Sequence, residues 1–356
     1  MTTKASSGVI LHPMRKNHII NGNLDHWQRG STFAATGDGG YTADRFVWYG
    51  AGGGIVTVNQ SADVPTLVQS GTLSKYSFHV DVTTADTSIA AGDYYLVGHI
   101  LEGYNYANLV GKTVTLSFWV KSPKTGIHSV GFRNNGADRS YVSEYTVNAA
   151  NTWEKKAITL DLNEVGGTQN YTFTQGLRIT WALMAGSNYT TSTFDQWTAS
   201  SALASTNQVN VVDSTANDFR LAQVQLEVGE GSTLLEVVDY HEELLRCMRY
   251  YERAIVNSNY GRFGMGVQTT LTTTAAQWPF MATKRATPTI SWFPSAANYA
   301  VFSGAAIALT NIAANEVTPT LAALTLTHAS TGAIGQAKEF LSNNNTDAYL
   351  AASAEL

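Results

Sequence analysis

The stretch that could most directly do chemistry runs from residue 17 to residue 30 and reads NHIINGNLDHWQRG. It sets Asp25 beside His26, and a carboxylate that orients an imidazole is the basis of many proton-transfer sites. However, the chain has no GxSxG turn, no HExxH helix and no reactive-cysteine setting that would complete such a site. Turn formers, a carboxylate and an indole are also typical of the first turn of a β-domain. We favour that second interpretation.

Hydrolysis of a glycosidic bond would require two carboxylic acids that face one cleft. The candidate acids are Glu102, Asp138, Glu144, Asp195 and Asp218. Nothing in their spacing selects two of them as a pair. We therefore expect that the chain is not an enzyme.

A sugar-binding role would need other residues. Aromatic rings in polar, loop-like surroundings can lie against the C–H face of a pyranose, while nearby amides and carboxylates bind its hydroxyls. The candidate glycan-binding residues are Tyr104, Asn105 and Tyr106 in EGYNYAN, Tyr189 in GSNYTT and Trp197 in FDQWTAS. A large β-protein also buries many aromatic side chains, so packing in the core is the alternative role for these rings.

Composition and charge exclude several classes of protein. The chain has 356 residues, of which 14% are charged, and a formal net charge of -5. Because Lys and Arg do not cluster, we do not expect nucleic acid as a partner. Cys247 is the only cysteine, so neither a disulfide framework nor a cysteine metal site is expected. No apolar run suits a signal-peptide core or a membrane span, which indicates folding in a cytoplasm without membrane insertion.

Alternating apolar and polar residues recur along most of the chain between clusters of Gly, Asn and Asp. This pattern predicts strands, and about nine of them before residue 230 match a two-sheet jelly roll. The fold class is therefore predicted to be all-β. The expected division is an N-terminal arm over 1–16, a jelly-roll sandwich over 17–238, a connecting helix over 239–256 and a smaller β-domain over 257–356.

One segment, DYHEELLRCMRYYERAI, interrupts the β pattern. Asp239 is placed to cap a helix N-terminus, and Glu242 three residues later fits a capping box. Leu244, Met248 and Tyr251 then follow with helical spacing. We expect this helix to connect the two β-domains.

Several motifs follow one another in a familiar order: IINGNLDHWQRG, LEGYNYANLVGKTVTLSFWVKS, VQLEVGEGSTLLEVVDYHEELLRCMRYYE and the ending SNNNTDAYLAASAEL. Together they resemble the tail-fibre and related virion proteins of tailed bacteriophages. The resemblance implies a jelly roll similar to carbohydrate-binding modules, followed by a small β-domain. It also implies a virion structural protein, a tail fibre, spike or adaptor subunit, that is made in the cytoplasm of the bacterial host.

The same resemblance implies partners. We expect other virion proteins, a homo-oligomer with a trimer favoured, and surface polysaccharide of the host as a ligand of the sandwich. Two alternatives stay open, which are a polysaccharide-degrading tail spike and the carbohydrate-binding module of a secreted enzyme. The absence of a signal peptide counts against the second, and the absence of a repetitive β-helix counts against the first.

A structural metal ion is the last implication of the resemblance. Carbohydrate-binding jelly rolls often begin with an NGxFE-like segment, whose acid helps an Asp near the last strand to hold Ca²⁺. The matching positions here are Asn23 or Asp25 and Asp218, although Leu24 and Asp25 replace the usual Phe-Glu. No cofactor is required, and the alternative is that both Asp side chains accept hydrogen bonds from nearby amides.

Overall fold

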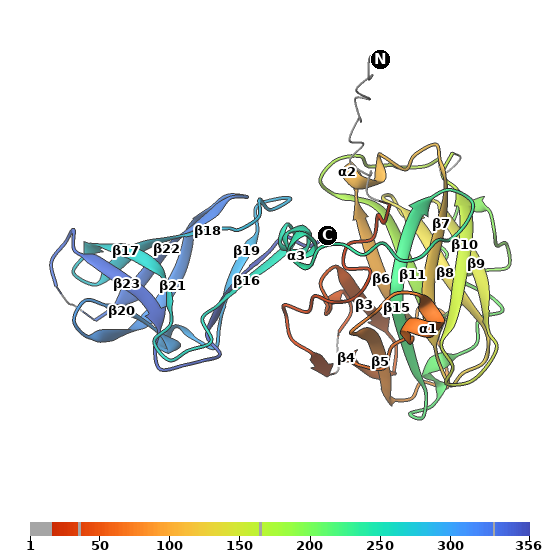
Figure 1. The fold of residues 1–356 in the computed structure, drawn as a ribbon, viewed down its shortest axis with the longest axis horizontal. Helices are drawn as coiled ribbons and strands as arrows, with labels where there is room; N and C mark the ends of the chain where they lie inside the picture. Colours follow the sequence, from red (N-terminus) through yellow and green to blue (C-terminus); the bar gives the residue numbers. More distant parts are fainter. Residues whose placement is uncertain (1–15, 35–36, 164–165, 330–331) are drawn as a thin grey trace, which may run out of the picture.

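The computed structural model describes residues 16–34, 37–163, 166–329 and 332–356, so nearly all of the predicted N-terminal arm lies outside the described residues. A large β-sandwich and a smaller β-structure are joined through the helix α3 (Tyr240–Met248), as Figure 1 shows. The prediction of an all-β fold with a jelly-roll sandwich, a connecting helix and a smaller β-domain is confirmed. In the described residues, no helix is long and apolar enough to cross a membrane.

The first sheet of the sandwich has six antiparallel strands. In spatial order they are β1 (Thr32–Ala34), β4 (Ile55–Ser61), β5 (Ser77–Thr84), β15 (Asp218–Val228), β7 (Thr113–Lys121) and β10 (Glu154–Asp161). Short helical turns interrupt the loops of the sandwich. They are α1 (Leu67–Ser70), α2 (Gly103–Tyr106) and the 3-10 helix η1 (Val211–Asp213).

The second sheet has seven antiparallel strands. In spatial order they are β13 (Trp197–Thr198), β9 (Ser140–Val147), β8 (Gly126–Asn134), β11 (Gln175–Ala185), β6 (Tyr94–Glu102), β3 (Phe46–Ala51) and β2 (Gly40–Tyr41). A parallel pair, β12 (Thr190–Thr191) with β14 (Ala204–Ser205), lies in the long polar segment before β15.

The core of the sandwich lies between these two sheets, because successive side chains of a strand point to opposite faces. In β11, Leu177, Ile179 and Trp181 are fully buried in the core. Arg178 and Thr180 alternate with them and face the outer side of the sheet. Strand β11 thus fills the core with one face, and on the other face Arg178 is partly exposed whereas Thr180 is buried.

The opening turn that contains Asp25 is structural. Asn21 has a φ of 61°, and its amide donates to the backbone carbonyls of His26 and Asp44. A Cβ atom at Gly22 would lie 2.2 Å from the carbonyl oxygen of Val224, so only glycine fits there. The Asn-Gly pair therefore holds the first loop against β15.

The smaller β-structure contains a closed barrel and a three-stranded sheet. The barrel strands, in spatial order, are β17 (Arg262–Thr270), β18 (Thr273–Pro279), β22 (Leu321–His328), β21 (Ala306–Val317), β20 (Tyr299–Phe302) and β23 (Ala337–Ser342). The sheet consists of β16 (Tyr251–Ile255), β24 (Tyr349–Ser353) and β19 (Thr289–Phe293), and the 3-10 helix η2 (Ala296–Asn298) precedes β20. One apolar cluster, separate from that of the sandwich, contains side chains from the barrel and from this sheet.

The predicted helix over 239–256 is too long. Asp239 caps the helix as expected, accepting from the backbone N–H groups of His241 and Glu242, but the helix ends at Met248. Residues from Tyr251 onward form β16 instead, because their backbone pairs with β24. The helical spacing of apolar residues therefore did not decide the structure after Met248. Pairing with β24, about 100 residues away in the sequence, made this segment a strand.

Candidate functional site

The first predicted group of sugar-binding residues forms α2 at the end of β6. Tyr104 is 54% exposed and Asn105 is partly exposed. Tyr106, however, is 1% exposed and stacks on Tyr171 with 6.0 Å between the ring centroids. Burial raises the pKa of the Tyr106 hydroxyl above its usual range. Tyr106 therefore belongs to the core and offers no ring face to a glycan, which corrects its assignment.

The second predicted position, Tyr189, is partly exposed on the outer side of the seven-stranded sheet. Its ring meets that of Tyr94 edge to face, at 5.2 Å between centroids. Its backbone carbonyl accepts from the N–H groups of Leu203 and Ala204, and its side chain packs against the small apolar cluster that contains them. The structure thus separates Tyr189 from the Tyr104 group and places it beside another tyrosine.

The third predicted position, Trp197, lies on the edge strand β13. Its Nε1–H donates to the backbone carbonyl of Asp161 at 2.8 Å, and its ring lies 5.7 Å from that of Tyr141. The side chain is only partly buried. These two contacts hold the indole in one orientation at the surface.

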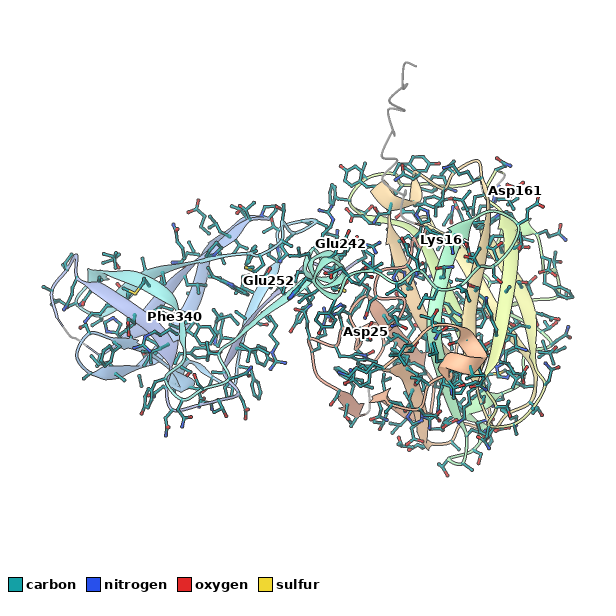
Figure 2. The ribbon with its side chains drawn as sticks, viewed as in Figure 1. Lys16, Asp25, Asp161, Glu242, Glu252 and Phe340 are labelled. Carbon is teal, nitrogen blue, oxygen red and sulfur yellow. The ribbon has the colours of Figure 1, made fainter. Side chains whose placement is uncertain are left out.

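Trp197 lines a cleft of about 380 Å³. The other lining residues are Thr113, Tyr141, Thr159, Leu160, Asp161, Asp195 and Gln196. They come from β7 and β10 of the six-stranded sheet and from β9 and the segment before β13 of the seven-stranded sheet. The cleft therefore spans the edges of both sheets. Figure 2 places Asp161 on the side of the sandwich that is remote from α3.

The groups in this cleft are suited to a polyhydroxylated ligand. Asp161, Thr159 and Gln196 are exposed, so their polar atoms are accessible beside the indole. Asp195 has a φ of 58°, and its Oδ1 accepts from the Ser143 hydroxyl at 2.6 Å. One aromatic face, two carboxylates and one amide therefore line a single concave surface, as in sites that recognise sugars.

The sequence suggested Trp197 as a candidate from its polar surroundings but did not suggest Asp161, which lines the same cleft. Asp161 ends β10 and is close to Trp197 only because the two sheet edges meet. No local sequence pattern gives that proximity.

The acids considered for catalysis are scattered. Glu102 binds Arg249, Asp138 accepts from Asn134 and Thr168, Glu144 accepts from Asn207, and Asp218 binds Arg220. Of the five acids, Asp195 alone lines the Trp197 cleft.

The two predicted calcium ligands have different partners. Asp25 accepts from the Asn23 amide at 3.0 Å, and burial raises the pKa of its carboxyl above the usual range. Asp218 pairs with Arg220 at 2.9 Å, and Nε2 of His79 lies 3.2 Å from the same oxygen. Asp25 follows the Gly22 turn, which packs near Val224, and residues 218 and 224 lie about 20 Å apart along β15. In the part of the chain described, no three His, Cys, Asp or Glu side chains cluster to hold a metal ion.

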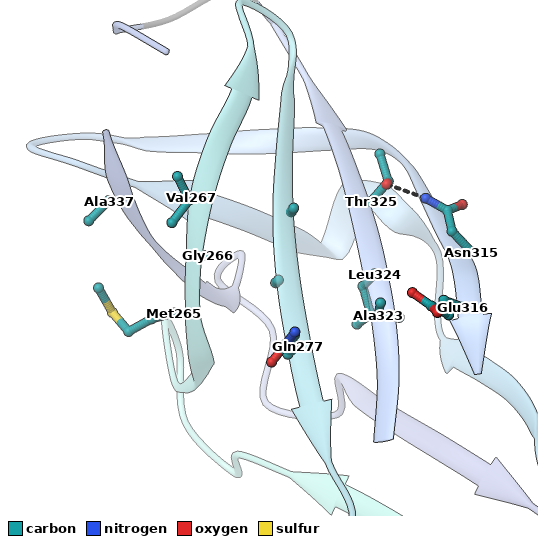
Figure 3. Close-up of a pocket in the computed structure, with 12 residues that line it drawn as sticks. Met265, Gly266, Val267, Gln277, Asn315, Glu316, Ala323, Leu324, Thr325 and Ala337 are labelled. Carbon is teal, nitrogen blue, oxygen red and sulfur yellow. Dashed lines mark hydrogen bonds between the residues drawn. The ribbon is translucent and has the colours of Figure 1, made fainter. Parts of the chain in front are cut away.

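A second hollow lies on the outside of the barrel and has a volume of about 630 Å³ (Figure 3). Met265 and Val267 stand at one side of it, and Asn315, Glu316 and Thr325 stand at the other. Its floor consists mainly of small or apolar residues, and no aromatic side chain lines it. It is therefore less suited to a sugar ring than the Trp197 cleft.

Comparison with protein-family models and with curated proteins gives no match for this chain. Solved structures do match, at low identity. The enzymatically active domain of tailspike protein 4 of bacteriophage CBA120 is 14% identical, with a TM-score of 0.31, and the match covers 55% of this chain. It covers only 21% of the tailspike chain, about a fifth of its length.

Carbohydrate-binding modules match over a similar share of this chain. A family 11 module from Clostridium thermocellum, in complex with a β-1,3-1,4-mixed-linked tetrasaccharide, is 12% identical with a TM-score of 0.31. The match covers 57% of this chain and 98% of the module. A family 4 module is 16% identical with a TM-score of 0.29, covering 59% and 99%. Likeness at this level carries no argument about function, so the site must be judged on its own geometry.

Proposed function

We propose that this chain is a non-enzymatic structural subunit of a bacteriophage virion and that its sandwich binds glycans on the surface of the host bacterium. The observation that carries the glycan-binding part is the Trp197 cleft. There, a partly exposed indole is held by hydrogen bonding and ring contact beside Asp161, Asp195 and Gln196. The motif order in the sequence supports the virion part.

The physical reason for preferring a sugar is the combination of groups. The indole face can cover the axial C–H groups of a pyranose, which removes apolar surface from water. Carboxylates and amides at the rim accept and donate hydrogen bonds with hydroxyls. Because the indole is already oriented by Asp161 and Tyr141, little side-chain freedom is lost on binding.

The test uses the full-length protein on an array of bacterial surface glycans. We expect Trp197→Ala to weaken binding by about tenfold or more, as truncation of a central aromatic contact often does. Tyr104→Ala removes an exposed ring at α2 and serves as the matched comparison. If Trp197→Ala binds every glycan as the unchanged protein does while Tyr104→Ala does not, the cleft assignment is wrong and α2 is the site.

A polysaccharide-degrading protein is the second candidate, because Asp161 and Asp195 line the same cleft. Release of reducing ends from a bound polysaccharide, lost in Asp195→Asn, would favour that activity. Binding without any release would support the non-enzymatic proposal.

The proposed virion role includes self-association, with a trimer favoured, and contacts with other virion proteins. Folding is proposed to occur in the cytoplasm of the bacterial host and to need no cofactor, nucleic acid or membrane insertion. Light scattering at micromolar concentration tests the first point. A mass equal to one chain at all concentrations would contradict self-association without other virion proteins.

A further inference from the structure

Two arginines face each other on the seven-stranded sheet. The register of β8 with β11 sets Arg133 directly opposite Arg178. Both belong to the outer set of side chains, because their neighbours Phe132, Leu177 and Ile179 point into the core. Like charges directly opposite one another on a sheet lower its stability. The pair therefore lacks an obvious role in the fold.

Arg178 has partial compensation from its neighbours. Its guanidinium carbon lies 4.8 Å from the centroid of the Tyr49 ring, and Nη2 donates to Oε1 of Gln175 at 3.0 Å. A Cβ atom at Gly98 would lie 2.7 Å from the Tyr49 ring, so glycine lets this ring lie across the sheet toward Arg178. Nε of Arg178 is nevertheless buried without a hydrogen-bond partner.

Arg133 has less compensation. Within residues 16–34, 37–163, 166–329 and 332–356, no carboxylate forms an ion pair with its guanidinium, and its Nε is buried without a hydrogen-bond partner. Burial, and then the charge of Arg178, lower the pKa of the Arg133 guanidinium to about 10. The side chain remains charged at neutral pH. An anion placed here would therefore offset both the burial of this charge and its repulsion from Arg178.

Three tyrosines lie on the same face of the sheet as this pair of charges. Tyr49, Tyr94 and Tyr189 pack against one small apolar cluster that includes Leu96 of β6 and Ala182 of β11, and the Arg178 guanidinium lies over the Tyr49 ring. The carboxylate of Asp38 does not pair with either arginine. It accepts hydrogen bonds from the Tyr94 hydroxyl at 3.1 Å and from the Gly50 N–H instead. The surface thus combines two cationic forks with aromatic rings.

We propose that Arg133 and Arg178 bind the carboxylate of an acidic sugar residue, with Tyr49, Tyr94 and Tyr189 contacting its ring. A guanidinium fork matches the two oxygens of a carboxylate, and the hydrogen bonds are charge-assisted. Aromatic rings beside the forks favour a carboxylate carried on a sugar over a free inorganic anion. This inference rests on the proposed glycan-binding function but uses residues outside the Trp197 cleft.

The test measures binding of the full-length protein to a polyuronate and to the same polymer after carboxyl reduction. We expect binding of the polyuronate to fall by about tenfold in Arg133→Gln and in Arg178→Gln, since each substitution removes a charge-assisted hydrogen bond to the carboxylate. Arg262→Gln, which removes an equal charge from an exposed barrel residue, is the matched control and should bind normally. The reduced polymer should not distinguish Arg133→Gln or Arg178→Gln from the unchanged protein.

The outcomes separate this inference from the broader proposal. If both Gln variants bind the polyuronate normally, the anion site is wrong, whereas glycan binding through Trp197 can still be measured on the reduced polymer. If inorganic phosphate displaces the polyuronate at equal concentration of anionic groups, the site is a general anion site and the sugar assignment is wrong. If the Gln variants change only the oligomeric mass, the arginines bind a neighbouring subunit instead.

A folding control accompanies the binding assay. Because the two charges repel, Arg133→Gln should melt at the same temperature as the unchanged protein or higher. Should it melt markedly lower, Arg133 has a structural role and the inference fails. Arg133→Lys keeps the charge but loses the fork, and we expect it to bind the polyuronate more weakly than the unchanged protein.

Discussion

The carboxylate of Glu102 accepts two hydrogen bonds from Arg249, from Nε at 2.9 Å and from Nη2 at 2.6 Å. Glu102 is 1% exposed and also accepts from the Tyr250 hydroxyl at 2.6 Å. The end of β6 is thereby held to the residues that follow α3. Because Glu102 is buried, its charge would be strongly destabilising without these hydrogen-bond partners.

We expect Glu102→Ala to lower the free energy of unfolding by about 3 kcal/mol, because it breaks a buried, hydrogen-bonded charge pair. Glu339→Ala is the control, since its partner Arg262 is largely exposed, and it should cost less than about 1 kcal/mol. Denaturant titration followed by tryptophan fluorescence measures both. Equal losses in the two variants would contradict the structural importance of the Glu102 contact.

Stability at acidic pH should depend on Glu154. Burial alone would raise the pKa of this carboxyl, but hydrogen bonds from Lys156, Ala149 and Asn148 outweigh burial and lower the pKa to about 2. A lowered pKa means that the folded state binds the proton less well than the unfolded state. The stabilisation is therefore complete above the usual value of 4.5 and is lost as pH falls toward 2.

This dependence can be measured with Glu154→Gln. The variant should be less stable than the unchanged protein at pH 7, and the difference should shrink between about pH 4.5 and pH 2. A difference that stays constant across this range would show that Glu154 does not titrate as described.

Removal of divalent cations should leave the melting temperature unchanged. Asp218 is paired with Arg220, and Asp25 is bonded to Asn23, so neither acid needs an ion to compensate its charge. Calorimetry with and without a chelator provides the measurement. A lower melting temperature with the chelator that Ca²⁺ restores would return Asp25 and Asp218 to consideration as ligands.

Limited proteolysis should cut first between residues 257 and 262, in the exposed loop that joins β16 to the start of β17. The cut chain should nevertheless stay together in native buffer, because β16 remains paired with β24 and Arg29 binds Glu355 at 3.0 Å. Size-exclusion chromatography before and after denaturation distinguishes a nicked complex from separate fragments. Early cuts within β7 would contradict this description of the fold.

Much of the fold was predictable because strand patterns are local. In TVTLSFWVK, apolar residues at alternate positions such as Leu116 and Phe118 predict β7, and these side chains do lie in the core. Asp239 marks the start of α3 through its own side chain. The end of α3 was not predictable, because strand pairing with β24 decides it. Tyr106 was misassigned for a related reason, since its short polar segment resembles a loop but turns the ring onto Tyr171.

The candidate binding surfaces were harder to predict than the strands. Trp197 could be proposed as a candidate from its neighbours in sequence, whereas Asp161 is brought to it by the meeting of two sheet edges. Arg133 and Arg178 are unremarkable in sequence, and only the register of β8 with β11 makes them a pair. Sequence patterns predict which strands form, but the spatial order of strands determines which side chains become neighbours.

The Trp197 cleft takes its lining from the edges of both sheets. A ligand seated there would contact both layers beside the hydrogen bond that Trp197 of β13 already donates to the carbonyl of Asp161 in β10. Separation of the layers would then require release of the ligand, so an occupied cleft should raise the unfolding temperature of the sandwich. The barrel has its own apolar cluster and should unfold at the same temperature with or without ligand. Binding of a glycan in the cleft would thus stabilise the sandwich and leave the barrel unchanged.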